Sequence, residues 1–290
     1  MMVRLGLFLI WLLHFLPLPL LAVAGRGFGL LLYALSRERR RVARTNLRLC
    51  FPAMSEKEWE ALVRRHFQAF GRSLLERGLA WWASPARLGR LIKVEGREHL
   101  AALEGKPVIL LAPHFVGLDM GWSRLTLERP LASMYSNQKN PVFNRRMLAG
   151  RSRFNAPLLV SRQEGLRPVL RALKEGRPFY YLPDMDYGPR DALFVPFFGV
   201  PAATISGLPR LAAMAGAAVV PCVTRQLPGG EGYAVRFYPP WDAYPSAEVA
   251  ADVRRMNAFI EERVREMPEQ YFWLHKRFKT RPKGEERIYS

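Results

Sequence analysis

The residues best suited to chemistry in this chain are His114 and Asp119, which stand five positions apart after an apolar run at 108–112. A histidine oriented by a carboxylate can act as a general base, because the carboxylate fixes the tautomer and stabilises the imidazolium. On a regular helix the two side chains would point about 140° apart, so a turn must bring them together. Asp119 would then orient the ring while its other nitrogen takes a proton from an alcohol, which could attack a thioester. The same pair also fits a capped turn without chemistry.

The chain around this pair alternates between short apolar runs and helical patterns, which predicts an α/β fold with helices around a central sheet. Runs typical of strands lie at 108–112, 130–135, 158–161, 179–182 and 218–224. His114 would therefore follow a buried strand, where active sites of α/β sheets commonly lie. Helical patterns are found at 165–174, 206–215 and 247–267, and a glycine suited to end a helix follows the first two.

A longer helix is predicted to begin after Ser55 and to reach about Trp82. Ser55 and Glu58 have the spacing of a capping box, in which each side chain binds the other residue's backbone N–H. An apolar stripe along the segment predicts that one face of this helix packs on the core. His66, which falls within it, is expected to be structural.

Residues 1–45 predict a membrane anchor with a basic flank, and residues 46–290 a single folded domain. Residues 5–24 are almost wholly apolar, about the 20 residues that cross a bilayer as a helix, although His14, Pro17 and Pro19 interrupt them. A cleavable secretory signal has a similar pattern. A retained anchor is favoured, because a second apolar run at 28–35 leads into a cytoplasmic-type cluster formed by Arg37, Arg39, Arg40, Arg41 and Arg44. The Pro pair would allow a bent or half-inserted helix.

The charge of the chain is strongly positive, with 44 Lys and Arg against 25 Asp and Glu, a net charge of +19. Such a surface attracts phosphates, anionic headgroups or an acidic protein partner. The only cysteines, Cys50 and Cys222, show neither a disulfide framework nor the ligand spacing of a zinc site. A reducing compartment is the simpler interpretation, and no metal is expected.

Several motifs, in order along the chain, resemble those of the bacterial lipid A late acyltransferases, the lauroyl and myristoyl enzymes of the HxxxxD glycerolipid acyltransferase group. His-Phe-Val-Gly-Leu-Asp at 114–119 matches the motif that defines the group. Further similar segments stand at 94–100, 181–189, 194–199, 202–204 and 268–282. Together they extend over nearly the whole chain, so the chain is identified as a member of that family.

The resemblance implies an acyltransferase with a mixed central sheet flanked by helices and an N-terminal membrane helix, at the cytoplasmic side of the bacterial inner membrane. It implies transfer of a fatty acyl group from an acyl carrier protein thioester to the hydroxyl of an acyl chain on a lipid A precursor, without a cofactor. An acceptor of another kind, such as a lysophospholipid, glycolipid or aminolipid, is the alternative within the same chemistry. A basic membrane or nucleic-acid-binding protein with a degenerate site is the alternative from another class. Intact His114 and Asp119 argue against degeneracy, and the apolar N-terminus argues against nucleic acid.

The family's assisting residues carry over to Arg151, which could polarise the thioester carbonyl or hold a phosphate, and to Asp184 or Asp186, between which the sequence does not choose. Arg190 lies near this pair of aspartates. Relatives often have an arginine directly after the residue that corresponds to Tyr135, and this chain does not; Lys139, Arg145 or Arg146 could replace it. In the C-terminal segment the resemblance implies buried aromatic side chains with a basic, phosphate-facing edge that includes Arg277.

Overall fold

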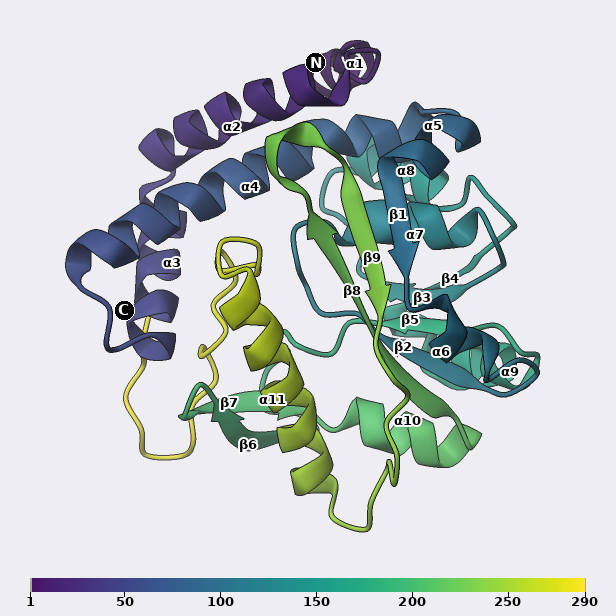
Figure 1. Cartoon of the computed structure of the whole chain (residues 1–290). Helices are drawn as coiled ribbons and strands as arrows, with labels where there is room; N and C mark the ends of the chain where they lie inside the picture. Colours follow the sequence, from purple (N-terminus) through teal and green to yellow (C-terminus); the bar gives the residue numbers. More distant parts are fainter. Residues whose placement is uncertain (1, 290) are drawn as a thin grey trace.

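The centre of the molecule is a seven-stranded mixed sheet with the strand order β1-β9-β8-β2-β5-β3-β4 (Figure 1). The computed structural model describes residues 2–289. Neighbouring strands are parallel except for the β8–β9 pair, which is antiparallel. The strands are β1 (Ile92–Glu95), β2 (Val108–Leu111), β3 (Ala132–Tyr135), β4 (Leu158–Ser161), β5 (Phe179–Tyr181), β8 (Ala218–Gln226) and β9 (Tyr233–Phe237). The predicted α/β class with a mixed sheet flanked by helices is confirmed.

All five apolar runs expected to be strands are strands of this sheet, with ends that differ by at most two residues. Four strands were not predicted: β1 and β9, which form one side of the sheet, and β6 (Ala192–Phe197) and β7 (Val200–Ile205), which form a separate hairpin. β1 and the hairpin strands combine buried with half-buried or exposed positions, unlike β2, which is buried throughout, so their sequences do not form continuous apolar runs.

Helices cover both faces of the sheet (Figure 1). The predicted capping box of Ser55 and Glu58 is present, and α4 runs from Glu56 to Trp82 across the sheet. The expected helices are found as α9 (Arg167–Lys174), α10 (Gly207–Ala215) and α11 (Val249–Glu266). The others after residue 50 are α5 (Pro85–Leu91), α6 (Arg97–Ala101), α7 (Leu118–Thr126) and α8 (Pro141–Arg151), with short 3-10 turns η1 (Arg162–Glu164) and η2 (Pro228–Gly230).

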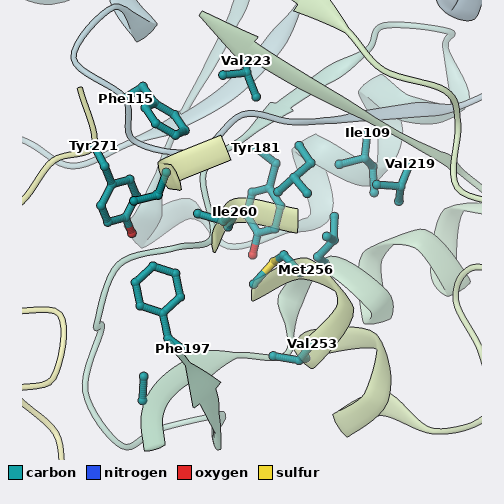
Figure 2. Packing of buried hydrophobic residues seen from close by; sticks show 14 of the residues in the cluster. Ile109, Phe115, Tyr181, Phe197, Val219, Val223, Val253, Met256, Ile260 and Tyr271 are labelled. Atoms are coloured by element: carbon teal, nitrogen blue, oxygen red, sulfur yellow. The ribbon is translucent and has the colours of Figure 1, made fainter. Parts of the chain in front are cut away.

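The apolar core is divided by the sheet into two clusters. One cluster joins Ile109 and Val219 of the strands to Met256 and Ile260 of α11 (Figure 2). Phe115 and Tyr271 belong to the same cluster, so the chain just after His114 is tied into the core. The other cluster packs α7, the end of α4 and α8 on the opposite side of the strands. The ends of the central strands therefore lie between two rigid layers, which can hold side chains in fixed positions.

The N-terminal segment forms two helices where the sequence predicted one apolar helix over 5–24. They are α1 (Met2–Leu13) and α2 (Leu18–Leu35); the break between them, residues 14–17, ends at Pro17, and Pro19 lies in the first turn of α2. Proline removes a backbone N–H and clashes with the preceding turn, so a continuous helix through these positions is disfavoured. By length and composition alone, α2 is apolar enough to cross a membrane. The arginine cluster lies on α3 (Arg37–Cys50), so the predicted division at residue 45 falls inside a helix.

Candidate active site

The loop that carries His114 is held in place by the C-terminal segment of the chain. The backbone N–H of Phe272 donates to the carbonyl of His114 at 3.0 Å, and that of Val116 donates to the carbonyl of Gln270 at 2.9 Å. Between them Phe115 and Tyr271 form a β-bridge, and their rings meet edge to face. The loop after β2 is thus fixed by backbone contacts with residues about 155 positions further along the sequence.

The imidazole of His114 is oriented by Asp184. Its Nδ1 lies 2.7 Å from Asp184 Oδ1, and the backbone N–H of His114 donates to Oδ2 of the same carboxylate at 2.9 Å. β2 and β5 are parallel neighbours with Leu111 opposite Tyr181, and the two residues each stand three positions beyond the strand end. Adjacent parallel strands therefore deliver the histidine and the carboxylate to the same place.

This carboxylate is ionised and fixes the ring's tautomer. Burial favours its neutral form, but the charge and the two hydrogen bonds of His114 lower the pKa of Asp184. An ionised carboxylate only accepts, so Nδ1 carries the hydrogen and Nε2 of a neutral ring has its lone pair free. Within residues 2–289 Nε2 has no hydrogen-bond partner, and the side chain is 17% exposed. The ring can accept a proton from a molecule that reaches the site.

Asp119 does not make the contact with the imidazole that the sequence predicted. It stands in the first turn of α7, where Oδ1 accepts from Arg151 Nη2 at 2.7 Å and from Nε at 3.1 Å. Arg77 Nη2 lies 3.2 Å from its Oδ2. α7 begins at Leu118, so the carboxylate points from this helix toward α8 and α4, and Asp184 takes the position expected for it.

The two arginines determine the charge of Asp119. Burial favours the neutral carboxyl, but Arg151 and Arg77 outweigh it, with a smaller effect of His114, and lower the pKa of Asp119 to about 2. Asp119 is therefore a permanent anion at neutral pH that holds two guanidinium groups. Both arginine side chains remain partly accessible, 24% for Arg151 and 22% for Arg77, which leaves room for a further anionic or polar group.

Arg151 reaches this position because the end of α8 packs very closely on α4. A Cβ at Gly150 would overlap the indole ring of Trp81, so only glycine lets α8 approach so far. Trp122 of α7 donates from Nε1 to the carbonyl of Arg151 at 2.9 Å. Arg151 is therefore an ion-paired side chain and not a freely solvated charge. Arg77 was not predicted as a site residue, because nothing in the surrounding sequence distinguishes it from Arg64, Arg65 and Arg72 on the same helix.

Asp186 and Arg277 have structural contacts where the sequence predicted substrate contacts. The carboxylate of Asp186 accepts from the backbone and hydroxyl of Thr280 at 2.6 and 2.8 Å and from the backbone of Gly188 at 2.9 Å. Arg277 is only 2% exposed and donates to Ala203 O and Thr204 Oγ1. These contacts fix the C-terminal segment against the loop after β5 and the β6–β7 hairpin. The expected basic, phosphate-facing edge is not formed by Arg277.

Lys139 and Arg190 are exposed and lie in loops outside the His114–Asp184 pair. The side chain of Arg190 is 96% exposed, with only Asp191 near it at 3.9 Å. Lys139 stands in the exposed turn before α8. Neither residue makes a hydrogen bond or ion pair with His114, Asp119 or Asp184 in the described part of the chain. Any role of these two charges therefore depends on a bound partner.

Two further histidines, the buried His66 and the half-buried His275, are neutral. Burial lowers the pKa of His66 to about 4, and its Nδ1 lies 2.9 Å from the carbonyl of Glu269. Burial and the nearby charge of Arg277 lower the pKa of His275 to about 4, and its Nε2 accepts from the backbone N–H of Asp186 at 2.9 Å. The expected structural role of His66 agrees with these contacts, and His114 is the histidine whose unpartnered Nε2 belongs to a ring oriented by a buried carboxylate.

Comparison with known proteins gives consistent results over nearly the whole chain. The family model for bacterial lipid A biosynthesis acyltransferases matches residues 1–280. The lipid A biosynthesis lauroyltransferase of Escherichia coli (strain K12) is 37% identical over 283 residues, which are 97% of this chain and 92% of that protein. The palmitoleoyltransferase of the same organism is 34% identical over 287 residues, 98% of this chain and 93% of that protein.

Solved structures also align with the chain. One of them is a 1-acyl-sn-glycerophosphate acyltransferase from Thermotoga maritima, with 14% identity and a TM-score of 0.40, over 85% of this chain and 97% of that one. A likeness of this strength has no bearing on the reaction. The sequence relatives and the family model carry the assignment.

Proposed function

Because the chain belongs to the bacterial lipid A biosynthesis acyltransferase family, we propose that it transfers a fatty acyl group from an acyl carrier protein thioester to the hydroxyl of an acyl chain on a lipid A precursor. The observation that carries the chemistry is the His114–Asp184 pair, with Nδ1 held by an ionised carboxylate and Nε2 unpartnered. A ring in this state is a general base for an alcohol, the group that the acceptor would offer.

In the proposed reaction, Nε2 of His114 takes the proton of the acceptor hydroxyl as its oxygen attacks the thioester carbonyl carbon. The carbonyl oxygen of the resulting tetrahedral intermediate carries the negative charge. Collapse of the intermediate breaks the carbon–sulfur bond, and the imidazolium returns its proton to the departing thiolate. The products are the new ester and the free thiol of the donor. Asp184 keeps the tautomer and stabilises the imidazolium throughout.

Arg151 and Arg77, which Asp119 holds in place, are proposed to stabilise the negative charge that develops on the carbonyl oxygen. Asp119 keeps both guanidinium groups side by side, and part of each remains accessible. Donors fixed before the reaction are worth more than mobile ones, because they need no reorganisation as the charge appears. The same pair of cations could instead hold a phosphate of the acceptor, since arginine binds carbonyl oxygens and phosphates through the same N–H groups. Substitution of either arginine would separate these roles, because loss of oxyanion support lowers kcat and loss of phosphate binding raises KM.

The positive charge of the chain supports an acyl carrier protein as the acyl donor. A net charge of +19 favours binding of an acidic carrier protein at an anionic membrane surface. Electrostatic attraction between exposed charges is screened over about 10 Å at 0.1 M salt and about 3 Å at 1 M. Turnover with the carrier-bound donor at low concentration should therefore fall as salt rises. Equal preference for acyl-coenzyme A, which is anionic but lacks a folded acidic surface, would contradict the proposed donor.

The enzyme is proposed to act at the cytoplasmic side of the bacterial inner membrane. The apolar α1 and α2 and the arginine-rich α3 that follows them support this location. The proposed anchor at 1–45, which precedes an acyltransferase domain at 46–290, can be tested on the full chain, which should stay in the membrane fraction in 1 M salt and be released by detergent.

The decisive test of the acceptor is mass spectrometry of lipid A from cells with the gene, without it, and with the gene that encodes His114→Ala. The proposed function predicts that lipid A loses one acyl chain without the gene and that only the unaltered gene restores it. An unchanged acyl pattern would instead favour another membrane lipid as acceptor. The His114→Ala arm separates a catalytic role from an indirect effect of the protein on the membrane.

A further inference from the structure

The exposed apolar surface of the molecule is concentrated on its first two helices. Of sixteen large apolar side chains that are exposed in the described chain, twelve lie between residues 2 and 35, among them Phe8, Trp11, Phe15, Leu20 and Leu31. Contiguous apolar surface of this kind is rare on a protein surrounded by water and marks a binding surface. The outward side of α1 and α2 is therefore a surface that meets an apolar partner.

The inward side of α2 is packed tightly on α4. A Cβ at Gly25 would lie 2.6 Å from the Cα of Arg72, and one at Gly29 would overlap the backbone of Phe67 and Gln68. On α4, a Cβ at Gly71 would overlap the backbone of Gly25 and Gly29 in turn. Three glycines thus allow the two backbones to touch, and the helices run antiparallel, side by side (Figure 1). A packed contact of this kind fixes α2 relative to the rest of the protein.

This packing is incompatible with a helix that crosses the bilayer. α4 would have to enter the hydrocarbon beside α2, together with exposed Arg64 and Arg65 and the end of the β8–β9 hairpin to which α4 is hydrogen-bonded. η2 would enter as well, because a Cβ at Gly230 would lie 2.6 Å from the Cα of Pro19. Exposed charges and irregular backbone are costly in hydrocarbon. We propose that α1 and α2 lie in the plane of an anionic membrane surface, with their outward side chains among the lipid headgroups and upper acyl chains.

The positions of the arginines fit this orientation. Arg26 is exposed on the outward side of α2, in the middle of the helix. In a spanning helix it would lie near the centre of the bilayer, whereas in an in-plane helix its long side chain reaches the headgroups. Arg4, Arg37 and Arg41 are also exposed along this segment. Their charge complements the phosphates of an anionic surface.

The orientation would bring the active site close to the lipid without exposing it to the bilayer interior. On α4, Gly78 packs against Ile10 and His14 of the N-terminal segment, and its neighbour Arg77 contacts Asp119. One helix, about 10 Å thick, therefore separates the lipid-facing layer from the site. The surface itself is defined by packing and does not depend on which lipid is acylated.

Label depth in a membrane tests the orientation directly. Single cysteines at Leu20, Val23, Leu30 and Leu35 would carry nitroxide labels in the full chain, bound to vesicles of phosphatidylethanolamine and phosphatidylglycerol. The native Cys50 and Cys222 are 5% and 1% exposed, so the unaltered protein supplies the background signal. We expect all four labels at similar shallow depths, within about 5–10 Å of the headgroup boundary. Depths that reach the bilayer centre, about 15 Å, between positions 23 and 30 and decrease on both sides would overturn the proposal, as would labels that remain in water.

A matched pair of glycine substitutions tests the docking on α4. Gly29→Ala places a methyl group into the backbone of α4, whereas a Cβ at Gly27, two residues away on the same helix, meets nothing within 4 Å. We expect Gly29→Ala to lower the midpoint of thermal unfolding by at least about 5 °C and Gly27→Ala to leave it unchanged or slightly raised. Equal midpoints for the two variants would show that α2 is not docked and would overturn the proposal. If Gly29→Ala does not fold, the depths of the four nitroxide labels still test whether α1 and α2 lie in the plane of the membrane.

Discussion

The active-site corner and the N-terminal helix pair are built in opposite ways. The corner brings together side chains from distant parts of the sequence, with His114, Asp119, Arg151 and Asp184 each from a different element and Arg77 from α4. The helix pair is one continuous segment, and its closest contacts with α4 are made where Gly25 and Gly29 have no side chain. In the corner, the role of each charged side chain depends on the group it pairs with. In the helix pair, the position of α2 depends on glycines, which have no side chain to keep the two helices apart.

The difference predicts how each region responds to substitution. A polar change in the corner should alter the reaction while the fold persists, because the backbone of the loop is held separately by the C-terminal segment. A small apolar change in the helix pair should alter packing and leave the chemistry unchanged.

The largest expected effect is that of His114→Ala on turnover. Loss of a general base typically costs a factor of about 10² to 10⁴. The fold should persist, since the backbone N–H of residue 114 still donates to Asp184 and the bridge between Phe115 and Tyr271 is unaffected. Steady-state turnover and the midpoint of thermal unfolding check both parts. Near-normal turnover in a folded variant would remove His114 from the mechanism.

The next largest effect distinguishes the two carboxylates. Asp184→Asn leaves a side chain that no longer requires a donor at Nδ1, so the other tautomer becomes available and turnover should fall by about 10² or more. Asp119→Asn should cost less, because it weakens the hold on the two arginines but leaves the base oriented. Turnover of the two variants at equal acceptor concentration makes the comparison. A larger loss for Asp119→Asn would restore the orienting role that the sequence first indicated.

The reason the sequence did not choose Asp184 lies in the strand order. His114 and Asp184 meet because β2 and β5 are adjacent and in a register that places Leu111 opposite Tyr181. The sequence indicated both strands but not that they are neighbours, since non-consecutive strands can pair in many orders. Without the register, Asp184 and Asp186 were equivalent. In the structure Asp186 instead binds Thr280, a contact that depends on how the C-terminal segment folds back.

Local patterns were more informative where the partners are local. The capping box at Ser55, the glycines after α9 and α10, and the apolar character of residues 5–24 and 28–35 were all visible in the sequence. Hydropathy cannot show which side of an apolar helix is covered, so the docking of α2 on α4 was not predicted. The predicted phosphate-facing position of Arg277 was wrong for a related reason. The sequence does not show whether a charged side chain is solvated or hydrogen-bonded within the core.

The ion pairs of Asp119 predict a dependence of stability on pH. Its pKa is lowered from 3.8 to about 2, so the folded state holds this proton less tightly than the unfolded state. The contribution, about 2 kcal/mol, is therefore fully present above about pH 5 and is lost as pH falls through the folded pKa. The free energy of unfolding of the unaltered protein should exceed that of Asp119→Asn by a constant amount from pH 5 to 7. Below pH 4 the difference should shrink; a difference that is independent of pH would contradict the assigned ion pairs.

The smallest expected effect concerns Arg77, which lies on the helix between the two regions. Arg77→Met removes one of the two cations at Asp119, but Arg151 keeps its own contacts with Oδ1, so turnover should fall only about tenfold. Arg65→Met is the matched control, because Arg65 is an exposed arginine on the same helix with no ion-pair partner in the described chain. Arg77→Lys keeps the charge but not the planar guanidinium and should retain intermediate turnover.

The pH profile of the Arg77 variants separates an electrostatic role from a merely structural one. Arg77 is one of the charges that lower the pKa of Asp119, so its removal should raise that pKa, and the loss of stability at acid pH should begin at a higher pH in Arg77→Met than in the unaltered protein. A variant that only perturbed the packing of α4 would lower the free energy of unfolding by the same amount at every pH. If Arg77→Met and Arg65→Met have the same turnover and the same dependence of stability on pH, Arg77 belongs to the packing of α4 and not to the active-site corner.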